Sequence, residues 1–343
     1  MKEAVSIKYT INQLAKLCKT SPATISRITN NPELVSPELR ERVENTMKEV
    51  GYKPNPFASR LSANATWGLG LFVFDILNPF FALIVRNISH LAMEKGIPLT
   101  VCDTENNQEK EELYLEYLLN TKVEGIIFAE GISLNIIEKA KKHTHVVLID
   151  CHYGHDAISE VHSDNYGGAC LAVEHLIGLN HTKIGFVGGP ENWPTVQDRF
   201  LGYQNTLTDH GIPIEPAYVF AGDLRFESGG RAIDHYLSLD DMPTAIFCAN
   251  DQMAYGALAR AKNRGLEVPR DLSLVGFDDI PLYNAFESKL TTVHQDIHAL
   301  SEHAFNLLFP KNKKVGFSDA VQEIVVPTYL VLGETCRELP AKT

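Results

Sequence analysis

The 343-residue sequence lacks long apolar runs and paired cysteine motifs. No stretch of about 18 uncharged apolar residues occurs, so no membrane-spanning helix is expected. The N-terminal segment MKEAVSIKYTINQLAKLCK is polar and has no apolar core, which argues against a secretory signal. The six cysteines are scattered without a CxxC pair, a spacing typical of reduced thiols rather than of a disulfide framework or a zinc site. These absences predict a cytoplasmic protein.

Catalytic and nucleotide-binding motifs are also missing. Gly68-Leu69-Gly70 lacks the third glycine of a dinucleotide fingerprint, and Gly188-Gly189-Pro190 lacks the lysine of a P-loop. No GxSxG elbow occurs. The 13 histidines show no metal-ligand spacing, and the cluster His152, His155 and His162 is expected to face water. The sequence therefore predicts a protein that is not an enzyme and that has no cofactor and no metal site.

The charge is distributed unevenly along the chain. The net charge is −12, which by itself argues against binding to nucleic acid. Residues 1–63, however, carry ten Lys or Arg against six Asp or Glu, a net of +4, whereas the remaining residues have a net of −16. A small basic segment in front of a large acidic body indicates contact with DNA through the first segment alone.

Three short helices are predicted in residues 10–50. Thr10 and Gln13 fit a capping box, and the first helix carries an apolar stripe of Ile11, Leu14, Ala15 and Leu17. Ser21 can cap a second helix that begins at Pro22 and buries Ile25 and Ile28. A third helix is predicted from Ser36 to Val50, with Gly51 as its stop. A tight turn between the first two helices is typical of a helix-turn-helix, although an unrelated helical hairpin would show the same pattern.

The segment TINQLAKLCKTSPATISRITNN and the later GYKPNPFASRL resemble the head and hinge of the LacI/GalR family of transcriptional regulators. Matching positions are Ala15, Lys16, Ser21, Ala23, Thr24, Ser26, Arg27, Asn30, Gly51, Tyr52, Pro54, Asn55, Ala58 and Leu61. The sequence departs from the family pattern at Lys19, Pro22 and Thr29. Pro22 offers no side-chain hydrogen bond, which puts base reading at that position in doubt.

The resemblance implies a DNA-binding surface on the second helix and on the hinge. The residues that it assigns to DNA are Thr10, Ser21, Pro22, Ala23, Thr24, Ser26, Arg27, Asn30, Tyr52, Asn55, Ala58 and Leu61. A hinge helix of about two turns after Asn55 would be unstable alone in water and would form only on DNA and a partner chain. By the same resemblance, Leu61 would enter the minor groove and kink the duplex.

Apolar strands alternate with amphipathic helices from Trp67 onward, for example the helices Phe80–Glu94 and Asn165–Leu179. Eight strands are predicted in two groups, and two late strands near Thr291–His294 and Val321–Val326 are expected to cross back. The eight are Leu69–Phe74, Leu99–Cys102, Gly125–Phe128, Val146–Ile149, Lys183–Val187, Tyr218–Ala221, Ala245–Cys248 and Leu272–Val275. This alternation predicts two doubly wound α/β lobes with a cleft between them.

Several stretches of the body also resemble the LacI/GalR family, among them NPFFA from Asn78, SDN from Ser163 and VGFDD from Val275. The family carries a two-lobed domain of the periplasmic-binding-protein type, whose cleft binds a small effector. Polar groups at strand ends together with aromatic rings are typical of a sugar site. The aligned effector-binding residues are Phe80, Phe81, Asp150, Arg199, Asn250, Asp278 and Gln295.

The predicted fold class is therefore α + α/β, a helix-turn-helix head followed by two doubly wound lobes. The expected domains are 1–53 for the head, 54–66 for the hinge and 67–335 for the body, whose first lobe is about 67–162 plus 292–318 and whose second is about 163–290 plus 320–335. The resemblance implies a repressor that binds a palindromic operator in double-stranded DNA as a homodimer. Its operator affinity would be controlled by a small effector, a sugar or sugar derivative. The tail ETCRELPAKT has no leucine heptad, which favours a dimer over a tetramer. Two alternatives stay open: control by a protein co-regulator, and a solute-binding protein without a DNA role.

Overall fold

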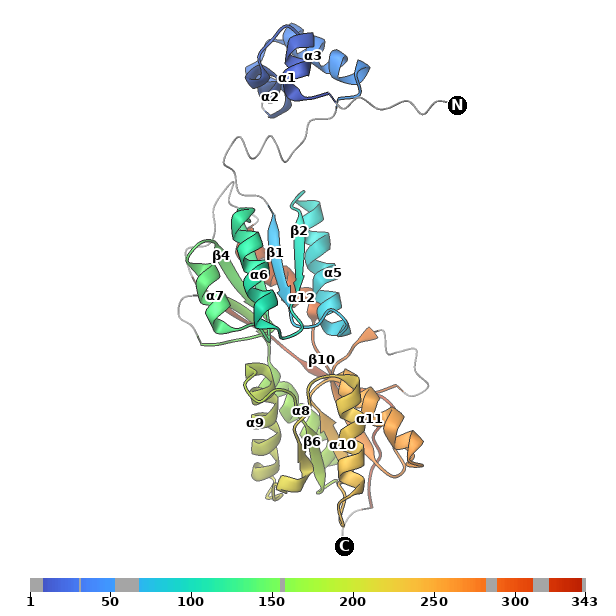
Figure 1. The fold of residues 1–343 in the computed structure, drawn as a ribbon. Helices are drawn as coiled ribbons and strands as arrows, with labels where there is room; N and C mark the ends of the chain where they lie inside the picture. The colour runs from blue at the N-terminus through green and yellow to red at the C-terminus, as the bar shows by residue number, and fades with distance from the viewer. Residues whose placement is uncertain are drawn as a thin grey trace, which may run out of the picture. The chain divides into compact units, whose positions relative to one another are not determined.

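The computed structural model describes residues 9–30, 32–52, 68–154, 158–281, 289–310 and 321–340. By its internal contacts the chain divides into two units, Met1–Trp67 and Gly68–Thr343. The first unit is the small helical body and the second contains both sheets (Figure 1).

The first unit contains three α-helices around a small apolar core: α1 (Ile11–Leu17), α2 (Pro22–Asn30) and α3 (Pro37–Glu49), with a 3₁₀ turn at Pro32–Leu34. The predicted capping box at the start of α1 is confirmed, because Thr10 and Gln13 each accept a hydrogen bond from the other's backbone N–H. The core residues are Leu14, Ala15, Cys18, Ile25, Ile28 and Val43. The predicted stripe on α1 is wrong at Ile11 and Leu17, which are exposed, whereas Cys18, the C-cap residue, is buried in the core.

The second unit begins with a six-stranded sheet in the order β11-β5-β4-β3-β1-β2, in which every pairing is parallel. Its strands are β1 (Leu69–Val73), β2 (Leu99–Asp103), β3 (Gly125–Ala129), β4 (His145–Ile149), β5 (Ser159–Ser163) and β11 (Glu323–Val326). Helices α5 (Pro79–Glu94) and α12 (Ile297–Leu308) pack together on one face, and α6 (Gln108–Asn120) and α7 (Leu134–Lys141) pack on the other (Figure 1). The sheet is apolar on both faces because helices cover both of them.

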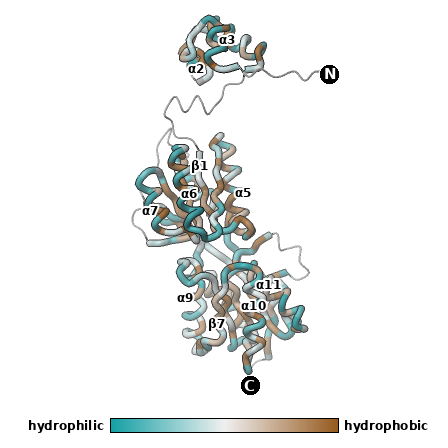
Figure 2. Tube along the Cα trace, in the orientation of Figure 1, coloured by the Kyte–Doolittle hydropathy of each residue, from teal (hydrophilic) through white to brown (hydrophobic). Residues whose placement is uncertain are grey.

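The second sheet has the order β12-β10-β9-β8-β6-β7, with β12 antiparallel to β10. Its strands are β6 (Ile184–Val187), β7 (Val219–Phe220), β8 (Ala245–Cys248), β9 (Ser273–Asp278), β10 (Thr291–His294) and β12 (Tyr329–Val331). Helices α8 (Asn165–Gly178) and α9 (Pro194–Asp209) pair with each other, as do α10 (Phe226–Leu237) and α11 (Asp251–Asn263). Hydrophobic stretches along α5 and β7 stand out in Figure 2.

The chain passes between the two sheets three times: after β5, after β10, and between β11 and β12. This distribution differs from the expected lobe boundaries, which placed residues 292–318 with the first lobe and 320–335 with the second. β10 extends the second sheet by pairing with β9, while β11 extends the first by pairing with β5. Residues 291–294 therefore belong to the second lobe and residues 323–326 to the first. The predicted class of two α/β lobes is confirmed.

Candidate functional site

The first candidate site is the outer face of α2. Ile25 and Ile28 are buried in the core of the head, whereas Pro22, Ala23 and Arg27 are exposed. Thr24 and Ser26 are half-buried. Burial of every third residue therefore leaves one side of α2 covered with small side chains and a single guanidinium at Arg27.

The turn before α2 fixes the start of that face. Lys19 has a φ of +49° in the position where a turn commonly uses glycine or asparagine. Ser21 accepts a hydrogen bond from the backbone N–H of Thr24 at 3.1 Å, and the two hydroxyl oxygens are 2.8 Å apart. Ser21 therefore caps α2, as predicted, and orients the first turn of the exposed face.

Of the predicted DNA-binding residues after α2, Tyr52 is partly buried and the others lie outside the part of the chain that the structure describes. Tyr52 packs partly against the head core, and burial raises the pKa of its hydroxyl. Asn55, Ala58 and Leu61 lie outside the described residues, as does the side chain of Asn30. Their assignment to DNA stays a prediction.

The second candidate site lies in the body, at the carboxyl ends of the parallel strands. The residues there are buried and polar, and they come from both lobes. We call this group the inter-lobe cluster: Glu130, Asp150, Ser163, Arg199, Asn250, Asp278 and Gln295. Carboxyl ends of parallel strands meet at one edge of a sheet, which is where open α/β folds bind ligands.

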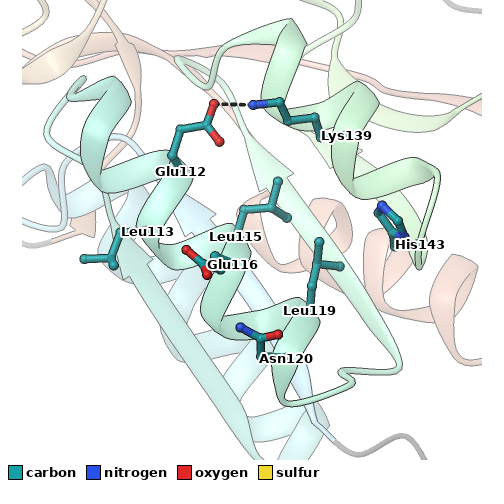
Figure 3. A pocket seen from close by; sticks show the side chains of 8 residues that line it. All are labelled: Glu112, Leu113, Leu115, Glu116, Leu119, Asn120, Lys139 and His143. Atoms are coloured by element: carbon teal, nitrogen blue, oxygen red, sulfur yellow. Dashed lines mark hydrogen bonds and ion pairs between the residues drawn. The ribbon is translucent and has the colours of Figure 1, made fainter.

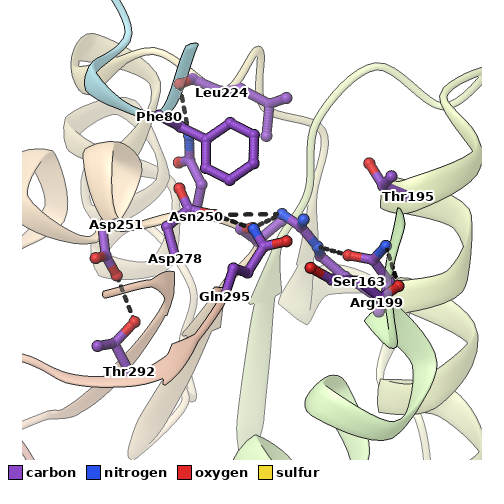
Figure 4. Close-up of polar contacts among 12 residues, drawn as sticks. Phe80, Ser163, Thr195, Arg199, Leu224, Asn250, Asp251, Asp278, Thr292 and Gln295 are labelled. Carbon is purple, nitrogen blue, oxygen red and sulfur yellow. Dashed lines mark hydrogen bonds and ion pairs between the residues drawn. The ribbon is translucent and has the colours of Figure 1, made fainter. Parts of the chain in front are cut away.

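Arg199 is the central cation of the inter-lobe cluster. Its guanidinium donates to the Asn165 side-chain oxygen at 2.8 Å and to the Ala249 carbonyl at 2.6 Å, and it lies 3.9 Å from the ring centroid of Phe277. A carboxylate oxygen of Asp278 is 4.0 Å away (Figure 4). Arg199 is 4% exposed, so this charge is held almost entirely by protein groups.

Asp278 ends β9 and contacts both Arg199 and Gln295. The Gln295 amide donates to its carboxylate at 2.7 Å. Burial raises the pKa of Asp278 to about 7, while Arg199 and the Gln295 hydrogen bond oppose that shift. Its φ of +123° is rarely adopted by a residue with a side chain. Such strain at a strand end is typical of a functional position.

Asp150 follows β4 and also has a positive φ, +56°. Burial and the neighbouring Glu130 carboxyl raise its pKa well above the usual value, and Arg199 opposes them. Asp150 Oδ1, Ser163 Oγ and Gln295 Oε1 are buried and have no hydrogen-bond partner; they are three of the five such side-chain atoms among the described residues. Buried polar atoms are normally satisfied, so these three indicate a place that a ligand completes.

The other predicted effector residues surround the same cluster. Phe80 and Phe81 are buried in the first turn of α5, with ring centroids 5.5 Å apart, and Figure 4 draws Phe80 together with Arg199 and Asn250. Asn250 caps α11 and donates to the Leu224 carbonyl at 2.9 Å. Its oxygen accepts from the Met253 backbone N–H, so these bonds fix the orientation of the side chain, and its effector role stays a prediction.

Sequence reasoning missed Glu130, which follows β3. Its carboxylate accepts a hydrogen bond from the Thr195 backbone at 3.0 Å and another from the Thr195 hydroxyl, so it joins the first lobe to α9. Burial raises the pKa of Glu130 to about 7, and the hydrogen bonds from Thr195 oppose this. The available signal was an acidic residue directly after the apolar strand GIIFA.

Aromatic and charged contacts also join the lobes. The Phe74 and Trp193 rings meet edge to face at 4.8 Å, and Gly131, at φ +91°, leaves room for Trp193, since a Cβ there would lie 2.5 Å from the indole. Asp75 and Arg225 form an ion pair at 3.5 Å. The two lobes are therefore in direct contact through both apolar and charged side chains.

The expectation that His152 and His162 face water is wrong. His152 bonds Asp198 of α9 at 2.7 Å, and its ring lies 4.7 Å from that of His162. His162 is buried on β5 because β11 covers it, and it bonds Glu323 at 3.2 Å. His155 lies outside the described residues.

The His152–Asp198 contact predicts a pH-dependent attachment of the lobes. The hydrogen bond to Asp198 raises the pKa of His152 against the opposing effect of burial. A raised folded-state pKa gives stabilisation that is present below about pH 6.5 and is lost as the pH rises through the folded-state value. We expect the wild type to lose up to about 1 kcal/mol from this pair between pH 5.5 and 8.5. Urea denaturation of wild type and of His152→Gln across that range checks this, and parallel pH profiles would contradict it.

Two surface hollows lie outside the cluster. One, of about 580 Å³, lies between α6 and α7, where Leu113, Leu115 and Leu119 adjoin the Glu112–Lys139 ion pair (Figure 3). The other, of about 400 Å³, is lined by Phe186, Phe200 and Phe220 beside β6 and β7. The three partnerless atoms described above belong to neither hollow, so the inter-lobe cluster is the stronger candidate.

No helix in the described ranges has the length and apolar character needed to cross a membrane. No three His, Cys, Asp or Glu side chains in those ranges are grouped so that they could hold a metal ion.

Comparison with known proteins finds a family match for each of the two units. Residues 10–55 match the family described as bacterial regulatory proteins, lacI family, and residues 173–336 match a periplasmic binding protein-like domain. The transcriptional repressor CytR of Escherichia coli K12 is 35% identical over 302 residues, covering 87% of this chain and 88% of CytR. The repressor PurR of Aliivibrio salmonicida is 31% identical over 307 residues, covering 89% and 92%.

Solved structures show the same architecture. The lac repressor dimer bound to operator and the anti-inducer ONPF has a TM-score of 0.83 at 26% identity, covering 96% of this chain and 99% of that one. A LacI family regulator from Enterococcus faecium with bound ribose has a TM-score of 0.69 at 26% identity, covering 80% and 100%. This chain belongs to the lacI family of bacterial regulatory proteins, which are DNA-binding transcriptional repressors with an effector-binding domain.

Proposed function

We propose that this protein is a homodimeric repressor of a palindromic operator, controlled by a small effector that binds at the inter-lobe cluster. The observation that carries the proposal is the set of buried polar atoms without partners, Asp150 Oδ1, Ser163 Oγ and Gln295 Oε1. A ligand class that fits partnerless polar groups beside the Phe80 and Phe81 rings is a sugar or sugar derivative. The relatives are named as repressors, which supports a non-enzymatic role and action on DNA in the cytoplasm.

The exposed face of α2 supports its role as the recognition helix. We propose that residues 1–53 form the DNA-binding head and 54–66 a hinge that forms on DNA. Two such heads in a dimer would reach half-sites about one helical turn apart. Arg27 would pair with guanine in the major groove, and the Ala23 and Thr24 methyl groups would meet thymine methyls.

We expect Arg27→Ala to weaken operator binding by about 1–3 kcal/mol, because a bidentate contact to one guanine per half-site is lost. Fluorescence anisotropy with operator and with random duplex measures the effect. Arg40→Ala is the matched control, since the Arg40 guanidinium is exposed on α3 and paired with Glu44 at 2.7 Å. Equal losses on operator and random duplex would assign Arg27 to phosphate contact only.

Effector control requires that the ligand bind one arrangement of the lobes more tightly than another. Contacts that span the lobes, such as Glu130–Thr195 and His152–Asp198, are the ones that a ligand in the cluster would strengthen or break. We expect operator affinity to change by about five- to 150-fold on effector binding, which corresponds to about 1–3 kcal/mol of coupling. Operator titration with and without a panel of sugars tests this, and an operator affinity that no binding sugar alters would contradict it.

A further inference from the structure

The hollow of about 400 Å³ beside β6 and β7 is built from the second lobe alone, and we call it the β7 hollow. One wall is the start of α9 and the other is the edge of the sheet, where β7 is the last strand. None of its lining residues belongs to the inter-lobe cluster. Its volume is within the range of about 300–1,000 Å³ that is typical of small-molecule sites.

The walls of the β7 hollow are apolar and largely aromatic. Phe186 of β6 and Val219 of β7 are directly paired, so their side chains lie on the same face of the sheet. The half-buried ring of Phe200 on α9 lies 5.3 Å from that of Phe186. Gly188 lines the hollow without a side chain, and a Cβ there would lie 2.9 Å from the Phe186 ring. The glycine therefore leaves room beside these rings, against which the flat face or edge of another aromatic ring can pack.

The polar side chains of the hollow lie at its mouth. Glu191 and Gln197 are both exposed, and Glu191 is the only charged residue among the described residues that line the hollow. The Gln197 side-chain amide donates to the Glu191 backbone carbonyl at 2.8 Å, which ties these two residues together. A carboxylate at the mouth attracts a cation and repels an anion, and the nearby phenyl rings also favour a cation. The ligand that fits is an aromatic body that carries an amine.

The first two turns of α9 separate the β7 hollow from the first lobe. Thr195 and Asp198 make hydrogen bonds to first-lobe side chains, whereas Val196, Gln197 and Phe200 line the hollow. A ligand in the hollow would pack against the back of these turns. It would thereby hold them in the position that the hydrogen bonds to the first lobe require.

We propose that the β7 hollow is a second ligand site, that it takes a small aromatic amine, and that its occupancy strengthens the attachment of α9 to the first lobe. The inference goes beyond the proposed function and does not depend on it. The site needs no effector in the inter-lobe cluster, and its ligand differs from a sugar in having an apolar, planar body.

Calorimetry on the full chain tests the ligand class with three probes that share an indole ring: tryptamine, tryptophol and indole-3-propionate. Near neutral pH their side chains are cationic, uncharged and anionic. We expect tryptamine to bind at least about fivefold more tightly than indole-3-propionate, with tryptophol between them, because an exposed carboxylate contributes modestly to each difference. Glu191→Gln should remove most of the difference and leave tryptophol unchanged. Preference for the anionic probe, or no binding of tryptamine at millimolar concentration, would overturn the inference.

Variants that fill the hollow test where the amine binds. Ala221 and Gln197 are exposed lining residues on opposite walls, so tryptophan at either position occupies the space. Ala221→Trp and Gln197→Trp should each weaken tryptamine binding at least about tenfold, and the pair keeps the test valid if one variant does not fold. Leu332→Trp is the matched control, since Leu332 is exposed beside β12, at the opposite edge of the same sheet. Unchanged affinity in a folded, filled variant would place the amine elsewhere and overturn the inference.

Hydrogen–deuterium exchange measures the effect on the first lobe. Residues 150–154 do not line the hollow, but they include His152, which bonds Asp198 of α9 at 2.7 Å. Saturation with tryptamine should slow exchange in this segment at least about twofold in the wild type and should have no effect in Ala221→Trp. Unchanged exchange in the wild type with tryptamine bound would overturn the proposed link between the β7 hollow and the first lobe.

Discussion

Replacing Arg199 by methionine is expected to lower the free energy of unfolding of the body by about 3–5 kcal/mol at pH 8. Methionine keeps much of the side-chain volume against Phe277 but removes two hydrogen bonds and the charge that offsets Asp278. The loss should shrink toward pH 5. Without the guanidinium, the pKa of the Asp278 carboxyl rises further above its unfolded value, and a raised acid pKa costs stability increasingly as the pH climbs above about 4.

Urea denaturation at pH 5 and pH 8 measures this difference. Arg231→Met is the matched control, since it removes an exposed guanidinium from the same lobe, paired with Asp223 at 2.7 Å. That change should cost less than about 1 kcal/mol. Adding Asp278→Asn to Arg199→Met should recover part of the loss by removing the uncompensated carboxylate. If Arg199→Met and Arg231→Met lowered the free energy of unfolding equally, or if the loss in Arg199→Met did not vary with pH, Arg199 would act through packing alone.

Most of the fold follows from periodic sequence patterns. Strands such as Ala245–Cys248 and Thr291–His294 were predicted at their observed bounds, because continuous apolar or β-branched runs are typical of buried parallel strands. β5, with the sequence SEVHS, was not predicted, since its polar residues break that pattern. β12 is three residues long and carries too little sequence to be recognised. Both strands depend on pairing with distant segments, β11 and β10.

The site was partly predictable for a related reason. Asp278 ends a strand, and Asp150 and Asn250 come directly after strands, so the topology alone places each of them at the carboxyl end of its own sheet. Glu130 follows a strand in the same way, and no family match drew attention to it. The pairing of His152 with Asp198 could not be predicted, because it joins two lobes whose relative placement is set by three separate crossings of the chain.

Helices α10 and α11 pack closely against each other. Gly256 of α11 faces the Phe226 carbonyl so closely that an added Cβ would lie 1.8 Å from that oxygen. A Cβ added to Gly229 of α10 would likewise lie 1.8 Å from the Met253 carbonyl oxygen. These contacts involve backbone atoms, so a side chain can be accommodated only if the helices move apart. We expect Gly256→Ala to cost about 3 kcal/mol of stability, at the upper end of the range for overpacked cores.

The same change should reach the inter-lobe cluster. Asn250 caps α11 and donates to the Leu224 carbonyl just before α10, so separating the helices displaces one side of the site. Effector affinity of Gly256→Ala should therefore fall even under conditions where the variant is fully folded. Gly178→Ala is the matched control, because Gly178 ends α8 with open space around its Cβ position. Alanine there should be neutral or stabilising by up to about 1 kcal/mol, since it reduces the entropy lost on folding. Thermal denaturation and effector calorimetry on the two variants check both effects, and a Gly256→Ala protein as stable as Gly178→Ala would show that α10 and α11 separate without cost.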